Sequence, residues 1–231
     1  GEFRIGRALY DQKLAFALMS PLSRQDIRSR AEADVLRTRN EMYTVAKVAL
    51  AGRPDAPDLP DEPDLEQQQA AIVAALALVS ADRPARDGVV DYARETLAEA
   101  TEFVRSRNLV TMPESPLEII LMPAFQRGVA VAYCDSPGPL DKGQRTFYAV
   151  SPIPADWTDA QVDSFLREYN KRSIADLTVH EAMPGHYLQI AHSNRYPSVL
   201  RAMLWSGPFV EGWAVYAERV MREQGFRGGD P

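Results

Sequence analysis

The stretch LTVHEAMPGHYLQIAH, residues 177–192, contains all three histidines of the chain, at positions 180, 186 and 192. Glu181 follows the first histidine, and the pair Pro184-Gly185 precedes the second. Imidazole nitrogens and carboxylate oxygens are common zinc ligands, and two histidines on one helix with a glutamate after the first are typical of zinc metallopeptidases. In that motif the histidines are about four residues apart, which brings both side chains to one helix face.

In this chain His180 and His186 are six residues apart. Six residues of a regular helix turn by about 600°, or about 240° net, so the two side chains would point to different sides. Pro184 lacks an N–H, and its ring clashes with the carbonyl group four residues back, which is that of His180. Gly185 can adopt backbone angles that are closed to other residues. We therefore expect the Pro-Gly pair to break the helix and to return His186 to the side of His180.

A third metal ligand is expected from a second helix, PFVEGWAVYAERVMREQG, residues 208–225. Glu211 lies in an apolar context on this helix, where an unpaired carboxylate would be costly. Glu218 lies two turns further along roughly the same face. It is a candidate partner for the free nitrogen of a ligand histidine, or an alternative ligand to Glu211. Glu181 would then be the general base.

The composition is that of an ordinary globular protein, with 45% hydrophobic and 25% charged residues among 231. The net charge of −6 argues against nucleic acid and anionic membranes as partners. No apolar run is long enough to predict a membrane span. The single cysteine, Cys134, excludes an internal disulfide framework. Because the chain starts at Gly1 rather than Met and stops just after a helix, we expect a fragment of a longer protein.

Residues 1–109 are expected to form a helical region. Ser23 and Asp26 have the spacing of a capping box and predict a helix that ends near Gly52. Residues 52–64 carry four prolines and five acidic residues, which predicts an exposed linker or loop. Two more helices are predicted at 65–80 and 86–107.

Residues 110–231 are expected to form the metal-site region. The segments 128–134 and 145–152 alternate in the manner of strands around a turn-rich loop, which predicts a β-hairpin. Thr158 and Gln161 predict another capped helix, which leads, with a break near Asn170, into His180. The expected fold class is therefore mainly α, with one small antiparallel β-hairpin or sheet.

HEAMPGHYLQ (180–189) and FVEGWAVYAE (209–218) resemble a bacterial family known as domain of unknown function 885. Its members carry His-Glu-x-x-Pro-Gly-His followed by Glu-Gly-Trp-Ala-x-Tyr-x-Glu. FQRGVAVAYCDSPGP (125–139) and TFYAVSPIPADW (146–157) also resemble segments of one branch of this family. The resemblance implies a helical, gluzincin-like zinc-peptidase core in which a glutamate is the third ligand. It places one zinc ion on His180, His186 and Glu211, with Glu181 as the base.

The resemblance also implies a substrate-binding strand edge, for which 127–133 and 145–151 are the candidates; an ordinary buried hairpin is the alternative. A transition-state stabiliser is expected from a Tyr, His or Arg side chain. The tyrosine candidates are Tyr133, Tyr148 and Tyr187, and packing in the core is the alternative for each. Gln189 is either a supporting residue beside the metal ligands or a polar residue with no role in the site.

The expected function is that of a zinc-dependent hydrolase, a metallopeptidase that acts on peptides or other small amides through a metal-activated water. One alternative is a helical binding or scaffold domain with a structural or degenerate metal site, closed by a fourth ligand such as His192. Another is a zinc enzyme for a non-peptide amide or ester. Members of the family are commonly longer, so the flanking parts of the same protein are expected partners. The sequence leaves the oligomeric state open, and the compartment as either exported (periplasmic) or cytoplasmic.

Overall fold

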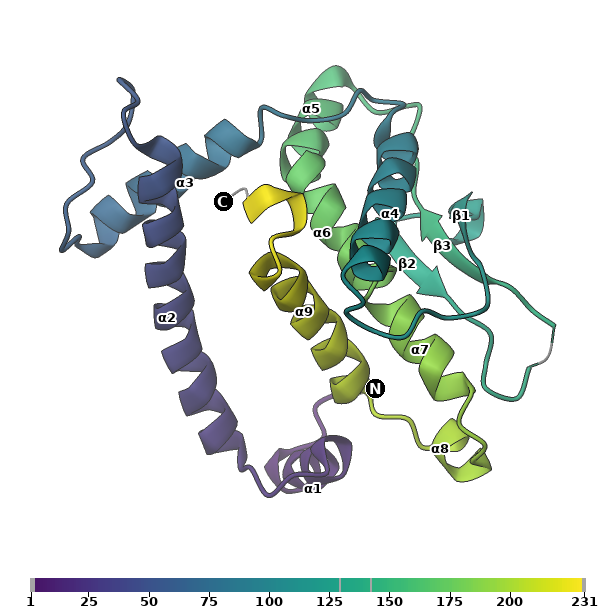
Figure 1. The fold of residues 1–231 in the computed structure, drawn as a ribbon. Helices are drawn as coiled ribbons and strands as arrows, with labels where there is room; N and C mark the ends of the chain where they lie inside the picture. Colours follow the sequence, from purple (N-terminus) through teal and green to yellow (C-terminus); the bar gives the residue numbers. More distant parts are fainter. Residues whose placement is uncertain (1–2, 129, 142, 230–231) are drawn as a thin grey trace. The chain divides into compact units, whose positions relative to one another are not determined.

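The computed structural model describes residues 3–128, 130–141 and 143–229 (Figure 1). Over these residues the protein is mainly helical and has one small sheet of three strands, which confirms the expected fold class. The chain divides into two compact units, Gly1–Leu78 and Val79–Asp230. The boundary therefore falls earlier in the chain than residue 109, because the helix predicted at 86–107 packs with the second unit.

The first unit contains α1 (Arg7–Leu18), α2 (Arg24–Leu50) and α3 (Leu65–Val79). The predicted capping box begins α2, where the Ser23 hydroxyl accepts from the backbone N–H of Asp26 at 3.1 Å. The segment predicted as an exposed linker or loop contains no buried residue and is mostly exposed, and the Tyr43 hydroxyl of α2 donates to the carbonyl of Pro60 in it at 2.6 Å. Tyr43, Ala46 and Leu50 of α2 and Ala71 of α3 form a small core.

The second unit holds the remaining elements. These are α4 (Val89–Ser106), β1 (Leu117–Leu121), the short 3-10 helix η1 (Ala124–Gln126), β2 (Ala132–Asp135), β3 (Thr146–Val150), α5 (Asp159–Glu168), α6 (Lys171–Glu181), α7 (His186–Asn194), α8 (Val199–Met203), α9 (Gly207–Glu223) and η2 (Phe226–Gly229). Among the described residues, no helix combines the length and the apolar composition that a membrane span requires.

The three strands lie in the order β1-β3-β2. Strands β2 and β3 are antiparallel and form the predicted hairpin, although both are shorter than expected and residue 129 lies outside the described part. Strand β1 was not predicted; it runs parallel to β3, with Leu117 opposite Thr146. Because β3 pairs on both sides, the expectation that 145–151 offers a free edge is wrong, and β2 carries the outer edge on its side of the sheet.

Helix α6 is the centre of the second unit and contacts α4, α9 and β2. It begins at the predicted break, where the Asn170 side chain accepts from the N–H groups of Arg172 and Ser173 at 3.0 and 3.2 Å. One face of α6 packs Ile174 with the sheet and α5, and another packs Val179 with α4, α7 and α9. The C-terminal end of α6, which carries His180 and Glu181, is thereby fixed between the sheet and α9.

Candidate metal centre

The Pro-Gly pair separates two helices at the place that the sequence predicts. Helix α6 ends at Glu181 and α7 begins at His186. Gly185 sits so close to the end of α6 that a Cβ there would be 1.8 Å from the carbonyl oxygen of His180. The close approach of the two backbone segments therefore requires a glycine at this position. The indole N–H of Trp213 on α9 holds the same turn by donating to the carbonyl of Pro184 at 2.9 Å.

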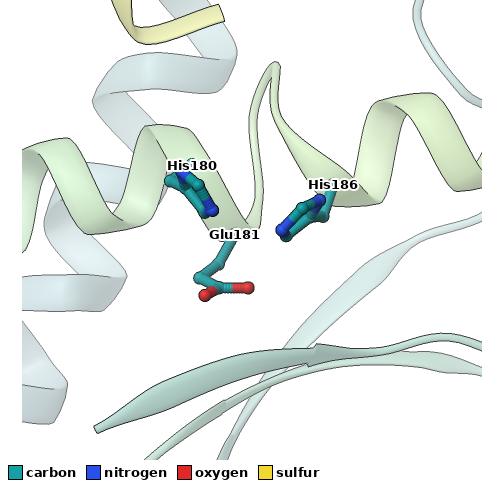
Figure 2. Close-up of side chains that lie close together, drawn as sticks. All are labelled: His180, Glu181 and His186. Carbon is teal, nitrogen blue, oxygen red and sulfur yellow. The ribbon is translucent and has the colours of Figure 1, made fainter. Parts of the chain in front are cut away.

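The break brings the two histidine rings together, edge to face, with their centroids 4.7 Å apart. Figure 2 shows His180 at the end of one helix and His186 at the start of the next, with the Glu181 carboxylate between them on the side of the strands. Ligand atoms of these three residues lie within 4.8 Å of one another. Glu211, on the first turns of α9, completes the cluster: its Oε2 atom lies 3.7 Å from Nε2 of His180 and 3.6 Å from Nε2 of His186.

His180 is oriented by Glu218. Its Nδ1 atom lies 2.6 Å from Oε1 of Glu218, the partner that the helical spacing on α9 suggested. This hydrogen bond raises the pKa of His180, although burial opposes it. With Nδ1 bonded to Glu218, Nε2 is the nitrogen that faces Glu211.

His186 has the opposite electrostatic environment. Burial, followed by the charge of the neighbouring His180, lowers the pKa of His186 and favours its neutral form. Neutral imidazole is the form that binds a metal ion. The site therefore holds one histidine fixed by a carboxylate and one kept neutral by burial.

The geometry fits a zinc ion. Two ligand atoms about 2.1 Å from a tetrahedral zinc stand about 3.4 Å apart. The Nε2 atoms of His180 and His186 lie 3.7 and 3.6 Å from the same oxygen of Glu211, too far for hydrogen bonds and close to that separation. Glu181 is the other nearby acid, but its Oε2 already accepts the backbone N–H of Cys134 at 3.1 Å. The residues that could hold the ion are thus His180, His186 and Glu211.

Comparison with known proteins shows which family the chain belongs to. A model described as "Bacterial protein of unknown function (DUF885)" matches residues 1–231. The chain belongs to the DUF885 family. No curated protein matches it. The family itself carries no assigned activity, so the chemistry of the site has to be argued from its geometry.

Two solved structures show how the family fold recurs. A protein described as a "putative lipoprotein of unknown function" from Shewanella oneidensis is 34% identical, with a TM-score of 0.82 over 98% of this chain. A protein described as a "putative lipoprotein" from Colwellia psychrerythraea is 20% identical, with a TM-score of 0.70 over 97% of this chain. The match covers 39% of the first solved chain and 35% of the second, so the present chain spans less than two-fifths of either.

The carboxylate of Glu181 lies on the side of the sheet (Figure 2). Burial raises its pKa, which the charge of His180 and the Cys134 N–H partly offset. The contact with Cys134 fixes the carboxylate against β2, and no sequence pattern indicates this contact because the donor is a backbone group. Trp213 was also missed as a structural anchor, although its position two residues after Glu211 was visible.

The three candidate tyrosines of this DUF885 chain are placed differently from one another. Tyr148 is fully buried, and its hydroxyl lies 3.2 Å from that of Thr178 in the core, so the structure does not bring it to the metal ligands. Tyr187 is buried and donates to the carbonyl of Ser115. Tyr133 on β2 is half-buried and donates to the side-chain oxygen of Gln126. Each of the three hydroxyls is thus bonded to a residue other than the metal ligands, and a transition-state role for any of them stays a prediction.

The third histidine lies outside the cluster. His192 is exposed at the end of α7, where its Nε2 atom lies 2.8 Å from the carbonyl oxygen of Thr111. Within the described part of the chain, the ligand cluster contains His180, Glu181 and His186 but not His192. The geometry therefore provides no fourth protein ligand from this residue.

Proposed function

We propose that this chain forms the metal-binding part of a zinc-dependent hydrolase, a metallopeptidase that acts on peptides or other small amides. The observation that carries the proposal is the convergence of two histidine Nε2 atoms on one Glu211 oxygen, at 3.7 and 3.6 Å. A bound zinc ion would act as a Lewis acid on a carbonyl and lower the pKa of a coordinated water to about 7. His180, His186 and Glu211 would hold it, and three protein ligands are the usual number in a catalytic site.

Glu181 is the proposed general base. One carboxylate oxygen accepts the Cys134 N–H, and an oxygen of the same carboxylate lies within 4.8 Å of a ligand nitrogen of each histidine. Burial raises its pKa, which makes the carboxylate a stronger base than an exposed glutamate. A proton taken at this oxygen can then be passed to a leaving amine.

Strand β2 is the proposed binding edge for a peptide backbone. It is an outer strand of the sheet, and the backbone N–H of Cys134 points from it to Glu181 rather than to β3. An extended peptide can add to such an edge through main-chain hydrogen bonds. A substrate bound along β2 would lie beside the proposed base.

The scaffold alternative predicts a closed metal site with a fourth protein ligand. Its candidate, His192, is bonded to Thr111 instead, which favours the catalytic reading. The names of the two solved relatives support a proposal that the whole protein is exported from a bacterial cell. The rest of that longer protein is then the first partner to consider for this part.

The test is hydrolysis of a peptide mixture, followed by mass spectrometry, with zinc-loaded wild type and Glu181→Gln. We expect the variant to keep its zinc and to lose activity by about 10²–10⁴-fold, the usual contribution of a general base. Simple amides and esters are tested in the same assay. Cleavage of these compounds but not of peptides would favour a zinc enzyme for a non-peptide amide or ester. Zinc-loaded wild type that cleaves none of these compounds would favour the scaffold alternative, and an equally active Glu181→Gln would remove the base from the proposal.

A further inference from the structure

One nitrogen of the proposed ligand set has no assigned role. The Nδ1 atom of His186 is buried and lacks a hydrogen-bond partner within the residues that the structure describes. The side chain of His186 is only 10% exposed, so bulk water does not readily replace that partner. Leaving a buried polar atom unpaired typically costs about 1–3 kcal/mol. His180 differs, because Glu218 holds its Nδ1 atom.

A second buried atom without a partner lies one helical turn away. Among the described residues, none bonds the side-chain oxygen Oε1 of Gln189. Gln189 follows His186 by three residues on α7, and residues at that spacing are neighbours on a helix surface. Helical side chains lean toward the N-terminus, so the side chain of Gln189 can reach over the turn that begins with His186, although the two atoms are not bonded to each other in this structure.

The two unpaired atoms are chemically complementary. When Nε2 of a histidine binds a metal ion, Nδ1 carries the proton and becomes a donor. The amide oxygen of Gln189 can only accept. The Nε2 atom of His186 faces Glu211. Nδ1 is therefore the ring atom that remains for a hydrogen bond to a supporting residue.

We propose that Gln189 is a positioning residue for His186: its Oε1 accepts the Nδ1–H and holds the ring with Nε2 toward Glu211. This inference rests on the proposed metal site. Gln189 would then hold His186 as Glu218 holds His180. His180 would be held by a residue of α9, and His186 by a residue of its own helix, α7. Gln189 acts through His186 and touches no reacting atom.

The first test is NMR of zinc-loaded wild type with ¹⁵N-labelled histidine, which is simple because the chain has 3 histidines. We expect His186 to show a protonated, slowly exchanging Nδ1 with a contact to the Gln189 side chain. This measurement needs no variant, so it does not depend on whether a substitution folds. Coordination of zinc through Nδ1, or a rapidly exchanging Nδ1–H, would overturn the inference.

The second test compares the zinc affinity of two variants by competition with a chromogenic chelator. Gln189→Leu keeps the approximate size but removes the acceptor, and we expect it to bind zinc about 10–100-fold more weakly. Gln189→Glu keeps the acceptor and should bind within a few-fold of wild type, with both variants melting near the wild type when metal-free. Equal affinity of Gln189→Leu, or equal weakening in both variants, would contradict a hydrogen bond to His186. Failure of the wild type to bind zinc would instead defeat the proposed metal site, and this inference with it.

Discussion

At the scale of single residues, Gly185 occupies the tightest position of the site. A Cβ there would meet the carbonyl oxygens of His180 and Val179 at 1.8 and 2.3 Å, and backbone atoms cannot move aside as a flexible side chain can. We expect Gly185→Ala to lower the free energy of unfolding by about 1–3 kcal/mol, as overpacking does, and to weaken zinc binding because His180 must shift. Urea unfolding and a zinc titration measure the two effects.

Gly212 is a matched control for that substitution. It follows Glu211 on α9, and nothing lies within 4 Å of the Cβ that alanine would add. Gly212→Ala should leave zinc binding unchanged and stabilise the helix by up to about 1 kcal/mol. If Gly185→Ala and Gly212→Ala have the same effect on zinc binding and on the free energy of unfolding, the close approach of Gly185 to α6 is not what shapes the site.

Cys134 offers a residue-scale test of the environment behind Glu181. Burial first, and then the charge of Glu181, raises the pKa of its thiol to about 12. At pH 8 the thiolate fraction in the folded protein is then lower by roughly a thousandfold than that of an unfolded chain with a pKa of about 8.5. Iodoacetamide should therefore alkylate the native protein far more slowly than the urea-unfolded protein, as mass spectrometry would show. Similar rates in the two states would mean that the thiol is open to solvent.

At the scale of elements, Trp213 joins the helix that carries Glu211 to the turn that places His186. Its indole N–H donates to the carbonyl of Pro184 at 2.9 Å. Trp213→Phe keeps most of the apolar contact and removes this bond, so we expect a loss of about 1 kcal/mol in the free energy of unfolding and weaker zinc binding. Trp205→Phe is the control, because that side chain is exposed. A Trp213→Phe variant that binds zinc as tightly as Trp205→Phe would show that the turn holds its shape without α9.

The helices were easier to predict than the sheet, for a physical reason. Ser23 and Thr158 reveal helix starts through local hydrogen bonds, and both predicted capping boxes are present. Strand β1 lies in a segment broken by prolines, and its parallel pairing with β3 is non-local, so no short pattern predicts it. For the same reason the sequence could not decide which strand was central and which was an edge.

The site followed the same rule. The six-residue spacing of His180 and His186 and the Pro-Gly break between them are local properties, so the sequence predicted that the two rings would meet. Glu211 lies on a separate helix, and it was predicted from the arrangement typical of zinc peptidases and not from local geometry. The Cys134 N–H that holds Glu181 could not be predicted, since backbone donors carry no sequence signal. The same local pattern also could not show that the Tyr148 hydroxyl faces Thr178 in the core.

At the scale of the whole molecule, the candidate site lies entirely in the unit Val79–Asp230. Helix α4 belongs to that unit because its buried residues, among them Ala93, Ala100 and Val104, pack against the same core as α6. The pattern of an amphipathic helix shows which of its faces is buried but not which element that face packs against. For this reason the helix at 86–107 was predicted to belong to the region before residue 110. The account's central claim is that this second unit brings His180, His186 and Glu211 together as zinc ligands.

The most direct measurement is the zinc content of the purified chain after reconstitution, by elemental mass spectrometry, with His186→Ala, Glu211→Ala and His192→Ala alongside. His192 is the matched control, since it lies on the same helix as His186 but bonds to Thr111. The account predicts about one zinc ion per chain in the wild type and in His192→Ala, and loss of that ion in the other two variants. Wild type without zinc, or zinc retained in both His186→Ala and Glu211→Ala, would contradict it.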